Sequence, residues 1–137
     1  MRTLLAAFLV LFSSLSFAGP GDQASVLRLG AQLRQQSQLL ANGAQQISNS
    51  EPGNFDAFQA WSDLNDFAFQ VGAFDDDARD YWYQPIMVVM PFQELQQKWQ
   101  TVNTEYVLLC PYGCGELDVL MHDCGDLMTR IPDYLPN

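Results

Sequence analysis

Residues able to carry chemistry are concentrated in one segment, 108–126. This segment holds all three cysteines of the chain, Cys110, Cys114 and Cys124, and its only histidine, His122. Thiolates and imidazoles are the side chains that bind transition metals and haem, and thiols also form disulfides. The spacing of these residues therefore decides which of these chemistries the segment can support.

The cysteine spacing favours a local disulfide. Cys110 and Cys114 bracket a Pro-Tyr-Gly turn, which brings them near the Cα separation of about 5.5 Å that a disulfide needs. Cys124 would lie about 15 Å beyond Cys114 along a helix, at an apolar position where a free cysteine packs as a small hydrophobe. We predict a Cys110–Cys114 bond and a reduced Cys124. A bond from either cysteine to Cys124 remains open if the turn folds back onto the helix.

Haem attachment and thioredoxin-like redox chemistry do not fit this segment. Both use Cys-x-x-Cys, followed by His for c-type haem, whereas the chain has Cys-x-x-x-Cys followed by Gly115. Asp118, His122 and Asp126 recur every four residues, and we expect them to share a solvent-facing side of a helix. Such a stripe could bind a transition metal ion weakly. A plain charged surface is the interpretation that we favour.

Enzymatic motifs are not found in the sequence. It contains no Gly-x-Ser-x-Gly, no His-Glu-x-x-His and no phosphate-binding loop. Paired carboxylates are expected on loops and outer faces, where nothing would raise their pKa values. A role without catalysis is therefore favoured.

The elements that must position these residues are helices. Apolar residues recur at spacings of three and four, and this pattern predicts helices over residues 22–49, 55–71, 91–109 and 117–131. We expect Gly72 to end the second helix, a short helix at 76–84, and an irregular apolar passage between Pro85 and Pro91. The predicted fold is an all-α, antiparallel, up-down four-helix bundle whose third helix is kinked or broken by proline.

The N-terminal residues 1–18 have the features of a secretory signal peptide. Arg2 precedes the apolar run 4–12, and Ser16-Phe17-Ala18 forms a small-x-small cleavage sequence. The run is too short to cross a bilayer. We therefore predict cleavage near Ala18, export to the periplasm or the cell exterior, no membrane span, and one helical domain over 19–137.

The charge of the chain limits its partners. Sixteen acidic residues stand against six basic ones, and the formal net charge is −10. Six cations are too few to neutralise the phosphate groups along a nucleic acid, which excludes nucleic acid as a partner. An unknown protein or a small ligand remains.

The composition favours a non-enzymatic binding or protein-interaction role. Aromatic side chains are common in interface hot spots, and the predicted contact residues are Tyr81, Trp82, Tyr83, Phe92 and Trp99. Burial of these rings in the core is the competing interpretation. The alternative function is a periplasmic metal or cofactor handler that uses the Asp118–His122–Asp126 stripe or methionine thioethers.

Overall fold

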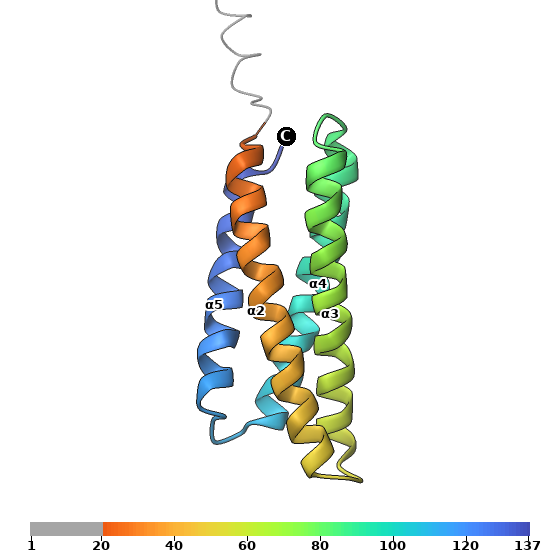
Figure 1. The fold of residues 1–137 in the computed structure, drawn as a ribbon, viewed down its shortest axis with the longest axis vertical. Coiled ribbons are helices and arrows are strands. Elements are labelled where there is room, and N and C mark those ends of the chain that lie inside the picture. Colours follow the sequence, from red (N-terminus) through yellow and green to blue (C-terminus); the bar gives the residue numbers. More distant parts are fainter. Residues whose placement is uncertain (1–20) are drawn as a thin grey trace, which may run out of the picture.

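The computed structural model describes residues 21–137, and the regular elements in this range are all helical (Figure 1). The predicted signal peptide lies outside the described residues. The elements in chain order are α2 (Gln23–Ser50), α3 (Phe55–Asp80), α4 (Pro85–Leu109), α5 (Glu116–Arg130) and the short 3₁₀ helix η1 (Ile131–Tyr134). Successive helices run in opposite directions. The predicted four-helix bundle is confirmed.

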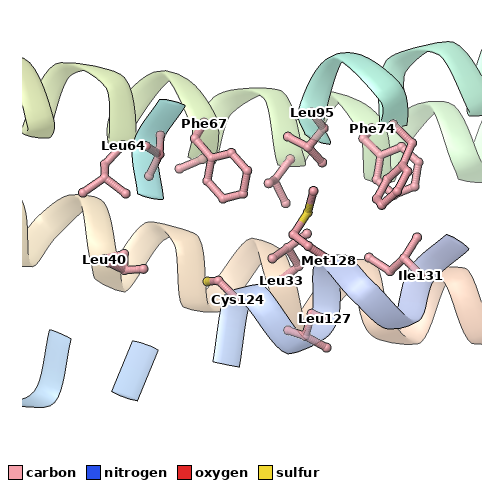
Figure 2. Close-up of a cluster of buried hydrophobic side chains, with 14 of the residues drawn as sticks. Leu33, Leu40, Leu64, Phe67, Phe74, Leu95, Cys124, Leu127, Met128 and Ile131 are labelled. Atoms are coloured by element: carbon pink, nitrogen blue, oxygen red, sulfur yellow. The ribbon is translucent and has the colours of Figure 1, made fainter. Parts of the chain in front are cut away.

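The core is built from the apolar stripes that the sequence predicts. Helix α2 packs against both α3 and α5, and α3 packs against α4. Figure 2 shows side chains from all four helices meeting between them. Fully buried members from the predicted stripes are Val26, Leu29, Leu33, Leu40, Leu64, Val71, Phe92, Leu95, Val102, Cys124 and Ile131. Because the stripes meet inside the bundle, polar positions are left on its surface.

Side chains cap the first two helices. The Asp22 side chain accepts a hydrogen bond from the backbone N–H of Ser25, and the Asn54 side chain accepts one from the backbone N–H of Ala57. These bonds satisfy donors that a helix N-terminus leaves free. At the other end of the chain, the carbonyl oxygen of Tyr134 accepts the N–H of Asp22. The C-terminal segment is thus tied to the start of α2.

Helix α3 is longer than the sequence predicts, and the predicted end at Gly72 is wrong. The helix continues to Asp80, so Gly72 lies inside the helix and faces Arg34 on α2 instead of ending it. A Cβ added at Gly72 would lie 3.5 Å from the guanidinium of Arg34 on α2. The predicted start of a new helix at Asp76 is also wrong. Asp75 and Asp76 lie instead near the C-terminus of α3, where the helix dipole disfavours carboxylates, and arginine side chains contact both.

Helix α4 begins at Pro85 and continues through Pro91, so it is not broken there. Residues 86–90 are helical rather than irregular, and this places Val88 in the core, where it is fully buried. Pro85 occupies the first helical position, where its missing N–H costs nothing. Pro91 leaves the carbonyl of Met87 without its helical donor.

The continuity of α4 predicts that replacing its two prolines has unequal effects on stability. Pro91→Ala restores a helical hydrogen bond and should raise the free energy of unfolding by about 1 to 3 kcal/mol. Pro85→Ala is the matched control and should change it by less than about 0.5 kcal/mol. Urea unfolding followed by circular dichroism measures both. Equal effects of the two substitutions would show that α4 does not run through Pro91.

Candidate functional site

The cysteine segment forms a closed turn between α4 and α5. The sulfur atoms of Cys110 and Cys114 lie at disulfide distance, with their Cα atoms 5.6 Å apart, as the sequence predicts. Gly113 and Gly115 have φ angles of 91° and 61°, which side chains disfavour, and so permit the turn. Cys124 is free and buried. Burial, followed by the charge of Asp123, raises the pKa of the Cys124 thiol to about 12, so it carries no thiolate at neutral pH.

Asp118 ties this turn to both helices, a role that the sequence analysis missed. The hydroxyl of Tyr106 on α4 donates to Asp118 Oδ1, and the backbone N–H of Cys114 donates to Oδ2 at 2.9 Å. The hydrogen bond from Tyr106, and then that from Cys114, lower the pKa of Asp118. Asp118 therefore does not stand free beside His122, because both of its carboxylate oxygens already accept hydrogen bonds. An acidic residue in the first turn of a helix was the available signal for a capping role.

The predicted metal ligands do not converge. His122 is exposed, and Asp126 pairs with Arg130 across 3.4 Å. Both line a shallow furrow between α4 and α5 together with Trp99, whereas Asp118 bonds to Tyr106. Within residues 21–137, no three His, Cys, Asp or Glu side chains form a group able to hold a metal ion. The metal hypothesis gains no geometric support.

The predicted aromatic contact set separates into buried and exposed members. Phe92 is 1% exposed and Trp82 is 7% exposed, so placing them on a contact surface is wrong. Phe92 packs on Phe74 with the ring centroids 5.2 Å apart. The half-buried Trp99 packs in the same way on Phe67. Phe92 and Trp99 belong to the 3/4 apolar repeat of α4, which accounts for their burial.

The exposed members belong to an apolar surface at the turn between α3 and α4. We call this surface the hairpin patch, and its residues are Tyr81, Tyr83, Ile86, Met87 and Met90, all exposed. Both tyrosines belong to the contact set predicted from the sequence, and the other three residues do not. The sequence analysis treated residues 86–90 as an irregular passage, whereas a helix puts Ile86 and Met90 on one face.

Acidic side chains adjoin the hairpin patch. Asp76, Asp77 and Asp80 occupy the last turns of α3, directly before Tyr81. Burial, followed by the charges of Asp76 and Asp80, raises the pKa of Asp77. The bundle end that carries the patch therefore combines apolar surface with negative charge.

A charge cluster bridges α3 and α4 away from this end. Lys98 Nζ lies 2.8 Å from Asp63 and 2.9 Å from Asp66. Burial, followed by contact with Asp63, raises the pKa of Glu105 to about 7. Burial would raise the pKa of Asp63 as well, but hydrogen bonds from Lys98 and Gln59 outweigh this effect and lower it. The expectation of ordinary carboxylate pKa values is wrong here, because the groups meet across helices.

Glu105 should make folding stability depend on pH near neutrality. Its pKa is higher in the folded state than its ordinary value of 4.5, so the unfolded chain loses this proton first. The free energy of unfolding should therefore fall as the pH rises from about 4.5 to 7. Glu105→Gln should flatten the profile of urea midpoints measured from pH 5 to 8, and the exposed control Glu94→Gln should keep it. A fall that persists unchanged in Glu105→Gln would contradict the assignment.

The thiol assignment predicts a simple count. Protein purified under oxidising conditions and then unfolded without reductant should titrate with one thiol, and with three after reduction. Cys124→Ala should leave none before reduction. Reducing the short Cys110–Cys114 loop should lower the free energy of unfolding by about 2 kcal/mol. A free Cys110 or Cys114 in the oxidised protein would overturn the pairing.

Two further findings bear on function. No helix within residues 21–137 has both the length and the apolar composition needed to cross a bilayer. Comparison with known protein families, curated proteins and solved structures finds no match for this chain.

Proposed function

We propose that this chain is an exported, non-enzymatic binding protein that docks a partner protein on the hairpin patch. The observation that carries the proposal is the exposure of Tyr83, Ile86 and Met90, at 94%, 65% and 49%. Clustered apolar side chains on a protein surface commonly mark interaction sites. Burying side chains of this size is worth about 1.5 to 3 kcal/mol each, enough together to support specific docking.

The chemistry of the patch selects a cationic, apolar partner segment. Asp77 and Asp80 lie at the same end of the bundle, outside the ion pairs that Arg34 and Arg79 form, and the chain as a whole carries a formal charge of −10. Complementary charge would steer the partner to this end and exclude acidic proteins. Met87 and Met90 offer flexible thioether side chains that adapt to different apolar shapes.

The patch also has a firm base. Trp82 lies between the two exposed tyrosines but is 7% exposed, so its ring anchors the turn in the core. Pro85 fixes the backbone at the start of α4. A contact surface held in this way loses little conformational entropy on binding.

The proposed location is the periplasm or the cell exterior. The signal-like residues 1–18 support export. The pair Cys110–Cys114 at disulfide distance suits an oxidising compartment. Both features agree with a partner that is itself exported.

Site-specific photo-crosslinking in the producing cells tests the docking surface. A photoreactive residue in place of Ile86 should yield a discrete adduct, because this position lies within the patch. The control position is Val119 on α5, which is 60% exposed, and it should yield no such adduct. Mass spectrometry should place the crosslink in a partner segment that carries Lys or Arg among apolar residues.

The purified partner segment then gives a quantitative test. The double substitution Ile86→Ser with Met90→Ser should weaken binding at least about tenfold, whereas Val119→Ser should leave it unchanged. Binding should also weaken as salt is added, since exposed charges are screened. Identical adducts from positions 86 and 119, or equal affinities of the two serine variants, would refute docking on the patch.

A further inference from the structure

A second feature that could bind a ligand lies along the α2–α3 face, apart from the tyrosines and methionines of the hairpin patch. It is an open furrow of about 500 Å³. Small, buried residues form the floor of the furrow: Ala41 on α2, and Ala68 and Gly72 on α3. Larger side chains at these positions would close the furrow. Polar and aromatic side chains surround this opening.

Carboxamides line the furrow on both helices. Gln38 and Asn42 come from α2 and Asn65 comes from α3, and all three side chains are exposed. Each carboxamide offers an acceptor oxygen and donor hydrogens in one plane. A ligand with neighbouring hydroxyl groups, each both donor and acceptor, matches this arrangement.

An aromatic ring stands beside the carboxamides. Phe69 lines the furrow and is 76% exposed, although it lies in the interior of α3 rather than at a helix end. A polar side chain would serve this position equally well for folding. Covering the ring with the apolar face of a ligand would remove apolar area from water.

The charges in the furrow are balanced. Arg34 lies 3.5 Å from Asp75 and 3.6 Å from Asp76. Arg79 also pairs with these two aspartates, at 3.4 and 3.9 Å. Two cations thus neutralise two anions, although the chain as a whole is strongly acidic. A neutral ligand fits this surface better than a charged one.

We propose that the furrow binds a neutral oligosaccharide. One sugar ring stacks its C–H face on Phe69, while its hydroxyl groups bond to the carboxamides of Asn42 and Asn65. The furrow follows two helices, so successive sugar rings lie along it. An extended peptide matches less well. It has no ring that offers an apolar face to Phe69 and polar groups around its edge to the carboxamides. This inference does not depend on the hairpin patch.

Isothermal titration calorimetry on the full chain tests the proposal with three probes: maltotetraose, cellotetraose and chitotetraose. At least one should bind with a Kd of about 1 mM or tighter. Phe69→Ala should weaken that binding at least about tenfold. The matched control is Phe55→Ala, which removes another exposed ring of α3, 72% exposed, and should change nothing.

A blocking variant keeps the test independent of the folding of Phe69→Ala. Ala73 is exposed and lines the furrow, so Ala73→Leu should obstruct it and abolish binding, while Ala31→Leu on the exposed side of α2 should not. Circular dichroism confirms that each variant is folded. Failure of all three sugars to bind at about 10 mM overturns the proposal. So does equal binding by Ala73→Leu and Ala31→Leu, or displacement of the sugar by acetyl-Gly-Ser-Gly-Ser-amide, which would identify a peptide furrow.

Discussion

The close packing of α2 against α3 is the contact on which the other features of this bundle depend. A Cβ at Gly30 would lie 3.1 Å from the carboxylate of Asp75, and Arg34 lies over Gly72. Helix α3 continues past Gly72 along this contact, so its last turns lie beside α2. The turn into α4 therefore falls at residues 81–84, which places the hairpin patch at the end of the bundle. The small residues that permit the contact also leave the furrow open.

Burying Asp75 in this contact has a cost that the neighbouring arginines offset. The residue is 3% exposed, and only Oδ2 faces Arg34 and Arg79, while Oδ1 has no hydrogen-bond partner. Replacing such a group with an apolar residue is often neutral or stabilising, so an ion pair of this kind is weak support for stability. The ion pairs of Asp75 have a more direct effect on the charge of the surface. The paired charges hold Arg34 over the seam and cancel the negative charge at the furrow.

The sequence predicts the fold well where structure depends on local spacing. The 3/4 repeat identifies the core side of every helix, and Asn54 marks a helix start because its cap bond is local. The predictions at Gly72 and Pro91 are wrong because glycine and proline usually interrupt helices. In this bundle both helices continue through these residues. The raised pKa of Glu105 and the hydrogen bond between Asp118 and Tyr106 could not be predicted from spacing alone. Each depends on a partner from another helix, Asp63 for one and Tyr106 for the other, and such proximity follows from the packed bundle.

Helix α3 separates the proposed activities by geometry. At about 100° per residue, Asp63 and Phe69 lie about 120° apart around its axis, one towards α4 and the other along the α2 side. The charge cluster can therefore titrate without contact with the furrow, and the hairpin patch at the end of the helix can be covered while the furrow stays open. A single rigid helix also allows these surfaces to differ in chemistry, because each is completed by a different neighbour. The proposed binding surfaces thus lie beside α3 and at its turn into α4, and not at the segment that holds the cysteines and the histidine.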